Sequence, residues 1–195
     1  MRVSKIGEGL SLLPVTPRFS GPLNRSGVGQ LRHCCQNERP SVWRKGVMQQ
    51  TARCQCGSLR AVVAGQPLIV NLCHCRACQQ RTGSVFSVGA YFKKTQVRCE
   101  GRSKVYTRRS DSGFAVLRHF CAECGSSVYW ELERAPGLCG IAVGCFTDPD
   151  FPAPSFSTWE ESRHLWVSLP AGIGQFPQSM NATAIAAALN RKTTP

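Results

Sequence analysis

Seven of the chain's twelve cysteines fall into three short clusters, and this spacing constrains the fold more than any other feature of the sequence. Sulfur atoms separated by one or two residues can converge on one tetrahedral zinc ion, whereas cysteines in a C-x-C pair make poor disulfides. The spacing therefore predicts zinc–thiolate sites in place of a disulfide scaffold. The clusters are Cys54-Gln55-Cys56, Cys73-His74-Cys75-Arg76-Ala77-Cys78 and Cys121-Ala122-Glu123-Cys124.

Seven thiolates divide most simply into one site of four and one site of three. Spacing does not fix which cysteines share an ion, but the simplest partition pairs the two clusters of two cysteines and leaves the triplet to hold a second ion. A site of four protein thiolates is closed and holds a fold together, whereas a site of three keeps a position for water or a substrate thiol. The partition predicts two zinc ions per chain, with chemistry at the triplet.

A fourth protein ligand would close the triplet and make both sites structural. The candidates are Cys99, Cys139, Cys145 and His74. His74 lies between two cysteines of the triplet, so we expect its side chain to point away from the ion. Cys139 and Cys145 lie in an apolar stretch, where cysteine usually behaves as a small buried hydrophobe.

The formal net charge of +13 raises the question of nucleic-acid binding. Residues 1–50 hold eight Lys/Arg and two Glu, a net of +6, and the remaining 145 residues hold sixteen Lys/Arg and nine Asp/Glu, a net of +7. The basic residues are thus not concentrated in the cysteine-bearing region, and zinc-bound thiolates add negative charge that the formal sum omits. We do not expect nucleic acid to be a partner.

The chain divides by composition into three parts. Residues 1–47 are rich in Pro, Gly, Ser and Arg and lack periodicity, so we expect a disordered extension or a true start at Met48. Residues 48–178 form the predicted zinc-binding domain, and 179–195 form a tail. No apolar stretch approaches the roughly 18 residues of a membrane span, and the N-terminus lacks a secretory signal pattern. A cytoplasmic location is expected.

Short apolar runs separated by Gly, Pro, Ser and Asp predict an all-β domain. Gly57 and Gly125 each follow the last cysteine of a pair, where glycine allows a positive φ. One helix is expected in the tail, over 182–190, with Asn181 as its N-cap. The expected strands are 59–64, 68–72, 85–92, 96–99, 104–107, 114–120, 128–132, 138–146 and 165–169.

The order of the cysteine motifs resembles that of the glutathione-dependent formaldehyde-activating enzyme family, which also includes centromere protein V. The motifs read C-x-C-G from Cys54, C-H-C-x-x-C-Q-x-x-T-G-S from Cys73 and F-C-x-x-C-G from Phe120. Two later stretches, Val143–Pro149 and Trp159–Trp166, also fit the family. The resemblance spans residues 54–176 and leaves out 1–47.

The resemblance implies a zinc-stapled domain of coiled antiparallel sheets, often called a β-tent. It also implies a carbon–sulfur lyase that joins formaldehyde and glutathione into S-hydroxymethylglutathione, although some members of the family act as binding proteins. The implied zinc ligands are Cys54, Cys56, Cys121 and Cys124 for a structural ion, and Cys73, Cys75 and Cys78 for an open ion that serves as the catalytic site.

An open zinc favours activation of a thiol, because a cation stabilises the thiolate that enters its fourth position. Three thiolates already donate much charge to the ion, so we expect weaker polarisation of a carbonyl than at a site of three histidines. Glutathione or another small thiol adduct is the expected partner, and a basic rim should bind its negative charge. The candidates for that rim are Arg76, Arg81, Lys93 and Arg118.

A zinc-stabilised binding module for nucleic acid, chromatin or the cytoskeleton is the alternative function. Basicity supports it, but residues 54–176 carry no stripe of Lys and Arg with interleaved aromatic residues. The sequence leaves the oligomeric state open.

Overall fold

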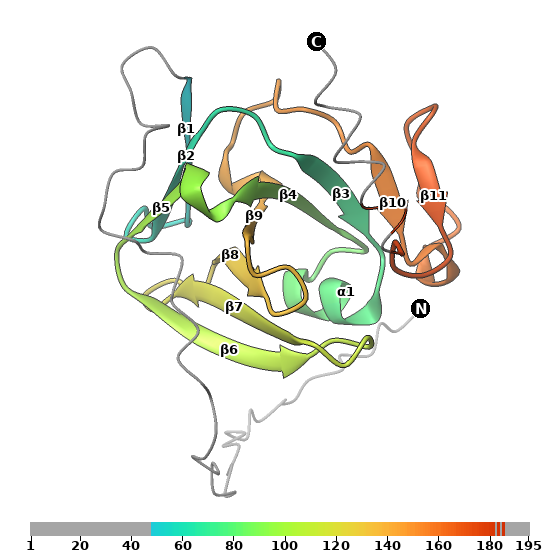
Figure 1. Cartoon of the computed structure of the whole chain (residues 1–195), viewed down its shortest axis with the longest axis horizontal. Helices are drawn as coiled ribbons and strands as arrows, with labels where there is room; N and C mark the ends of the chain where they lie inside the picture. The colour runs from blue at the N-terminus through green and yellow to red at the C-terminus, as the bar shows by residue number, and fades with distance from the viewer. Residues whose placement is uncertain (1–47, 182, 184, 186–195) are drawn as a thin grey trace, which may run out of the picture. The chain divides into compact units, whose positions relative to one another are not determined.

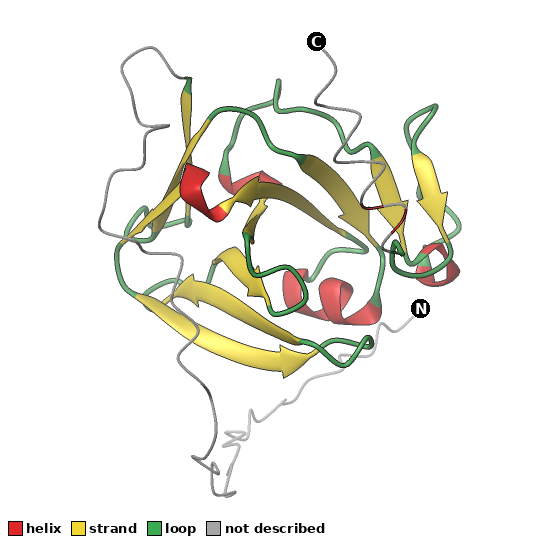
Figure 2. Ribbon diagram, in the orientation of Figure 1, coloured by secondary structure: helices red, strands yellow, loops and turns green. Residues whose placement is uncertain are grey.

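The computed structural model describes residues 48–181, 183 and 185. The segment 1–47 and most of the helix expected over 182–190 lie outside the described residues. Eleven strands in the described part form two sheets, with one α-helix and three short 3-10 turns between them (Figures 1 and 2). The predicted all-β class is confirmed.

The smaller sheet contains three antiparallel strands in the order β1-β2-β5. They are β1 (Gln49–Arg53), β2 (Arg60–Ala64) and β5 (Val97–Glu100). Alternate residues of β2 point to opposite faces, and Ala61 and Val63 are fully buried on one of them. The turn between β1 and β2 carries the first cysteine cluster.

The larger sheet contains eight strands. Most neighbours are antiparallel, but β10 pairs in parallel with both β3 and β11. In sheet order the strands are β11 (Gly174–Phe176), β10 (Phe156–Thr158), β3 (Ile69–Cys73), β4 (Ser87–Lys93), β9 (Leu138–Ala142), β8 (Ser127–Leu132), β7 (Ala115–Cys121) and β6 (Ser103–Arg109).

One face of the larger sheet, the core face, packs against the three-stranded sheet. Phe92, Tyr129 and Ile141 project from neighbouring strands and join Ala61 and Val63 in one buried cluster. Each of these side chains is at most 1% exposed, so this cluster is the main source of hydrophobic stabilisation. The core therefore lies between the two sheets.

The opposite face, the triplet face, carries different chemistry. Because side chains alternate along a strand, Cys73, Tyr91, Trp130 and Arg118 lie on this face, in strands β3, β4, β8 and β7. The helix α1 (Arg76–Thr82) follows β3 in the chain (Figure 1). It lies over the triplet face, since Arg81 contacts the Trp130 ring. The triplet face thus brings basic and aromatic side chains to the middle cysteine cluster.

Several expected elements differ from the structure. The strand expected over 165–169 is wrong, because this segment begins with a turn whose Leu165 and Trp166 are exposed. The strand expected over 138–146 ends at Ala142 and continues as the 3-10 turn η3 (Val143–Cys145). Helix α1 and strands β1, β10 and β11 were not expected.

None of the described helices has the length and apolar content to cross a membrane.

Candidate metal centres

The first and third cysteine clusters meet where the β1–β2 turn faces the end of β7. The Sγ atoms of Cys54 and Cys56 are 3.5 Å apart, and those of Cys56 and Cys121 are 3.6 Å apart. The Cys124 sulfur completes the group, in which all four sulfurs lie within 4.8 Å of one another. We call this group the four-cysteine centre. It joins the three-stranded sheet to the eight-stranded sheet.

Glycine ends both cysteine turns of this centre. Gly57 has φ +78° and Gly125 has φ +74°, as the sequence predicted. Their amides donate back to the first cysteine of each pair, Gly57 N to Cys54 O at 3.0 Å and Gly125 N to Cys121 O at 3.1 Å. The tight turns point the sulfurs of each pair toward one another.

The four-cysteine centre fits a zinc ion. Zinc–sulfur bonds of about 2.3 Å in a tetrahedron place the sulfurs about 3.8 Å apart, which is close to the observed spacing. Hydroxyl groups surround the sulfurs: Ser58 Oγ lies 3.0 Å from Cys56 Sγ and 3.1 Å from Cys121 Sγ. The hydrogen bond from Ser126 lowers the pKa of Cys124 to about 5, which favours the thiolate that zinc requires.

An open hollow of about 580 Å³ adjoins the four-cysteine centre. Arg53, Cys56, Cys145 and Thr147 are among the residues that line it. Cys56 is exposed and Cys124 is partly exposed, whereas Cys54 and Cys121 are buried, so solvent reaches one side of this centre.

The middle cluster forms a second centre at the junction of β3 and α1. Cys73 ends β3, Cys75 is the N-cap of α1 and Cys78 lies in its first turn, where its amide donates to Cys75 O at 2.9 Å. The three sulfurs lie within 4.8 Å of one another and are partly buried. Among the described residues, no fourth Cys, His, Asp or Glu side chain joins this triplet centre.

Two arginines stand beside the triplet centre. Hydrogen bonds from Cys73 and Cys75 hold the pKa of Cys78 well below its usual range, and the charges of Arg118 and Arg81 act in the same direction. Arg81 and Cys78 lie close enough for the charge of each group to affect the pKa of the other. The neighbouring sulfurs raise the pKa of Cys73, so the negative charge is carried by Cys78, beside two guanidinium groups. Hydroxyl groups surround the four-cysteine centre instead.

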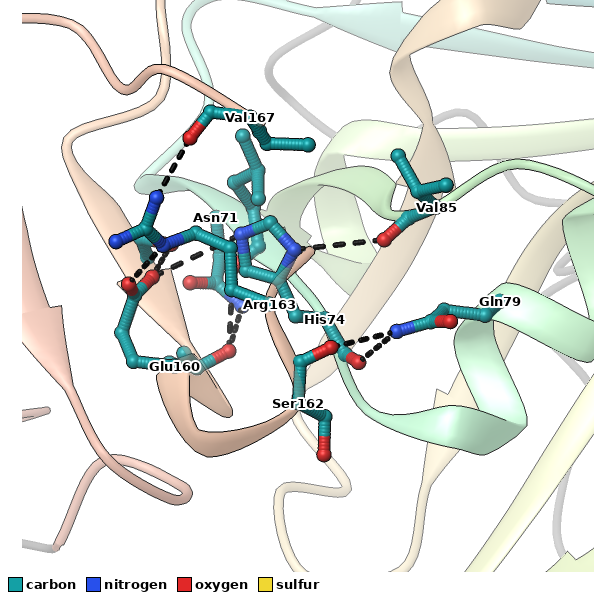
Figure 3. A network of polar contacts seen from close by, with 11 residues as sticks. Asn71, His74, Gln79, Val85, Glu160, Ser162, Arg163 and Val167 are labelled. Atoms are coloured by element: carbon teal, nitrogen blue, oxygen red, sulfur yellow. Dashed lines mark hydrogen bonds and ion pairs between the residues drawn. The ribbon is translucent and has the colours of Figure 1, made fainter. Parts of the chain in front are cut away.

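His74 does not join the triplet centre, as the sequence predicted. Its ring lies between Val85 and Glu160 instead (Figure 3). The side chain is fully buried, with Nδ1 3.4 Å from Val85 O and Nε2 3.7 Å from a carboxylate oxygen of Glu160. Burial lowers the pKa of His74. Arg163 Nε donates to the other oxygen of Glu160 at 2.7 Å. The network ties the loop after β10 to the triplet segment.

Gln79 of α1 makes the second tie to that loop (Figure 3). Its Nε2 donates to His74 O at 2.7 Å and to Ser162 O at 3.0 Å. The Trp159–Trp166 stretch thus packs beside α1, which gives a structural role to a motif that the sequence marked only by its resemblance.

The other candidates lie elsewhere. Cys99 is buried in β5, Cys139 is buried on the core face, and Cys145 lies beside the hollow at the four-cysteine centre. Arg76 is exposed on α1, and Lys93 is exposed at the far end of β4, about 20 Å from Ser87 at 3.3 Å per residue. The structure brings only Arg81 and Arg118 of the four basic candidates to the triplet.

Sequence reasoning missed the residues that surround the ligands. Ser58 and Ser126 each lie two residues beyond a cluster cysteine, and this proximity was an available signal. Trp130 is far from the triplet in sequence and reaches it only through strand pairing, so no local pattern marks it. Glu160 lies in the Trp159–Trp166 stretch that the resemblance marked, but its contact with His74 required the structure.

Comparison with known sequences places these residues in a wider group. The sequence model of the family described as glutathione-dependent formaldehyde-activating enzyme matches residues 49–162, an interval that contains both cysteine centres. Two curated fungal proteins carry that description as a provisional name. The Fusarium vanettenii protein is 28% identical over 116 residues, which are 56% of this chain and 61% of the relative.

The Colletotrichum graminicola protein is 27% identical over 117 residues, or 57% of this chain and 61% of the relative. The matched part of this chain thus spans about three fifths of each relative's length. A crystal structure of a Rhodobacter sphaeroides protein is 20% identical, with a TM-score of 0.41 over 52% of this chain and 92% of that one.

Proposed function

Because the chain belongs to the glutathione-dependent formaldehyde-activating enzyme family, we propose that it makes or breaks the carbon–sulfur bond between glutathione and formaldehyde at the triplet centre. In this proposal the reaction is of the carbon–sulfur lyase type. The observation that carries it is the set of three converging cysteines with no fourth described ligand, beside two arginines. The four-cysteine centre is proposed to be structural.

Cys73, Cys75 and Cys78 are proposed to hold a zinc ion, and Cys54, Cys56, Cys121 and Cys124 a second one. The ion at the triplet supplies, when bound, a positive charge that stabilises a ligand thiolate in its fourth position. Formation of the adduct joins the glutathione sulfur to the aldehyde carbon, while the carbonyl electron pair moves to oxygen, which takes up a proton. The reverse reaction breaks the same bond and releases the proton.

Charge balance supports an anionic fourth ligand. Three thiolates and a divalent zinc ion sum to −1, and a fourth thiolate brings the sum to −2. Arg81 and Arg118 offset this charge at the triplet, and neither has a carboxylate partner among the described residues. The four-cysteine centre reaches −2 with protein ligands alone and faces Ser58 and Ser126 instead.

A buried polar atom supports the same location. Arg81 Nε is one of four buried side-chain atoms of the described residues that lack a hydrogen-bond partner, and Arg81 lies beside the triplet. The unpartnered His74 Nε2 faces Glu160 instead. Buried donors are normally satisfied, so Arg81 Nε favours a bound ligand or ordered water there.

Cobalt substitution tests the proposal, because a fourth thiolate changes the visible bands of a tetrahedral cobalt–thiolate site. Glutathione should change the spectrum of the cobalt-loaded protein, and S-methylglutathione, whose sulfur cannot become a thiolate, should not. Equal responses to both peptides, or no response to either, would contradict thiol binding and favour a non-catalytic binding module.

Catalysis needs a separate measurement, because formaldehyde and glutathione also combine spontaneously. The rate of adduct formation and breakdown should exceed that of the matched Cys75→Ser protein at equal concentration. A rate that does not differ between the two proteins would exclude the lyase proposal even where glutathione binds.

A further inference from the structure

Arg81 reaches back from α1 to the triplet face. Its Nη2 donates to Ser87 Oγ at 2.6 Å, and its guanidinium carbon lies 5.5 Å from the centroid of the Trp130 ring. Its Nε is buried and has no hydrogen-bond partner. Arg81 is thus held at two points on the triplet face, and its Nε–H donor is left unpaired.

Trp130 supports Arg81 from the sheet side. A Cβ atom on Gly140 would lie 2.2 Å from the Trp130 ring, and one on Gly89 would lie 2.7 Å from it. The indole therefore rests on the backbone of β9 and β4 at positions that exclude any side chain. A ring fixed in this way offers its other face to a guanidinium, an arrangement that cation–π attraction favours.

A second guanidinium acts at the same place. Arg118 pairs across the strands with Trp130, and its charge affects both Arg81 and Cys78. In the described part of the chain, no carboxylate lies within ion-pair distance of either arginine. Two neighbouring cations without an acidic partner favour the entry of an anion.

We propose that Arg81 is the specificity-determining residue of the triplet centre, and that its unused Nε–H selects an anionic fourth ligand over a neutral ligand. Trp130 positions Arg81, and Arg118 strengthens the preference. This inference rests on the proposed function, because it assumes that the triplet has an open position. The ligand class that it names is a thiolate or a carboxylate-bearing thiol, and neutral nitrogen donors are disfavoured.

The test compares an anionic ligand with a neutral one at the same cobalt ion. The full-length, cobalt-loaded protein is titrated with 2-mercaptoethanol, which binds as a thiolate, and with imidazole, which binds as a neutral donor. In the Arg81→Met protein, thiolate affinity should fall about tenfold or more, because a charge-assisted hydrogen bond is lost. Imidazole affinity should change by less than about threefold.

Matched variants separate selectivity from general damage. Arg76→Met removes an exposed arginine from the same helix and should leave both affinities unchanged. Arg81→Lys keeps the positive charge but loses the Nε donor, and it should recover only part of the thiolate preference. If the Arg81→Met protein does not bind a second cobalt ion, the Arg118→Met protein is titrated instead. This substitution leaves the Arg81 contacts in place, and it should still reduce the preference for thiolate over imidazole several-fold.

The outcomes also distinguish this inference from the proposed function. If neither ligand changes the spectrum of the wild-type protein, the triplet is closed, and both proposals fail. If both ligands bind but Arg81→Met weakens them equally, or weakens neither, the open site stands and the role of Arg81 is overturned.

Discussion

The cysteines of the four-cysteine centre link the two sheets, whereas those of the triplet centre lie in one local segment. Cys121 is buried at the end of β7 and lies 3.6 Å from Cys56, which belongs to the turn of the other sheet. Cys75 belongs to a single local segment, between β3 and α1. Loss of one thiolate should therefore have different consequences at the two centres.

Replacing Cys121 by Ser should unfold or aggregate the protein, or lower its thermal midpoint by at least about 10 °C. Structural zinc contributes folding free energy directly, and about 1 kcal/mol shifts the midpoint of a domain of this size by about 2–4 °C. Cys75→Ser should leave a folded domain with about half the zinc. Calorimetry and metal analysis on both proteins provide the measurement, and similar midpoints for the two would contradict the structural assignment.

Substitution of Gly140 tests whether the backbone of β9 holds the Trp130 ring in place. Gly140→Ala places a methyl group 2.2 Å from the indole, so the ring must shift. We expect a loss of about 1–3 kcal/mol in unfolding free energy, which is typical of overpacking, together with a reduced preference for thiolate at the triplet.

Gly137→Ala is the matched control for Gly140→Ala. Gly137 precedes the same strand, and a Cβ atom there meets no atom within 4 Å. Its unfolding free energy and its ligand preference should both stay close to wild type. Equal behaviour of the two alanine variants in chemical denaturation would mean that Trp130 does not depend on Gly140.

Single residues were predictable to different degrees. The cysteine clusters and the orientation of His74 follow from local spacing, because adjacent side chains of a short loop cannot all face one ion. The Arg81–Trp130 contact depends on the pairing of β8 with β9 and on the path of α1, so it required the structure. The partition of the cysteines into two sets was the simplest one that the sequence allowed, and the same two groups of sulfurs converge in the structure.

The strands β7 and β8 are joined to the start of η2 (Lys94–Gln96) by a buried charged network. His119 Nε2 lies 3.0 Å from Glu131 Oε1, and Lys94 Nζ donates to Glu131 Oε2 at 2.5 Å. Burial alone would raise the pKa of Glu131, but the bonds from His119 and Lys94 lower it to about 2. The carboxylate therefore stabilises the packing of these elements.

Glu131→Gln should lower the unfolding free energy at pH 7 by about 3 kcal/mol, since each pKa unit corresponds to about 1.36 kcal/mol. The folded pKa lies below the ordinary value of 4.5, so the stabilisation is complete above that pH and is lost as the pH falls toward 2. The difference between variant and wild type should shrink accordingly in denaturation curves. Glu161→Gln, at an exposed position, should show no such difference at any pH.

Elements with a strong local sequence pattern were predicted from the sequence, whereas elements that form by pairing with distant strands were not. The segments that form β2, β4, β7 and β8 contain short apolar runs between turn residues. Helix α1 has only seven residues, which gives too few turns for a helical period. The strands β10 and β11 contain three residues each and exist through parallel pairing with β3, which is distant in sequence.

The segment 165–169 shows the opposite error. Its apolar residues suggested a strand, but Leu165 is fully exposed and Trp166 is 71% exposed. Apolar content without a neighbouring strand to pair with does not produce a sheet element.

At the scale of the whole molecule, the two centres lie on opposite faces of the eight-stranded sheet. Cys121 shares the core face with His119 and Leu117, whereas Cys73 lies on the triplet face. The four-cysteine centre therefore closes the space between the sheets, and the triplet centre stands apart from it. This separation allows one centre to be structural while the other exchanges ligands.

A chain that starts at Met48 should match the full chain in thermal midpoint and in zinc content. The described strands begin at Gln49, and both cysteine centres lie beyond that residue. Differential scanning calorimetry and elemental analysis of the two proteins provide the comparison. A midpoint lower by several degrees would show that residues 1–47 contribute to the folded state, since about 1 kcal/mol corresponds to about 2–4 °C.

Because one centre bridges two sheets and the other belongs to one loop, metal acquisition should be sequential. An ion at the four-cysteine centre would stabilise the packing of the two sheets, and the folded sheets would in turn position the loop of the triplet centre for a second ion. When zinc is scarce, the folded chains would then hold an ion at the four-cysteine centre and none at the triplet centre. The zinc supply would then determine what fraction of the folded chains carries an ion at the triplet centre, without changing the number of folded chains.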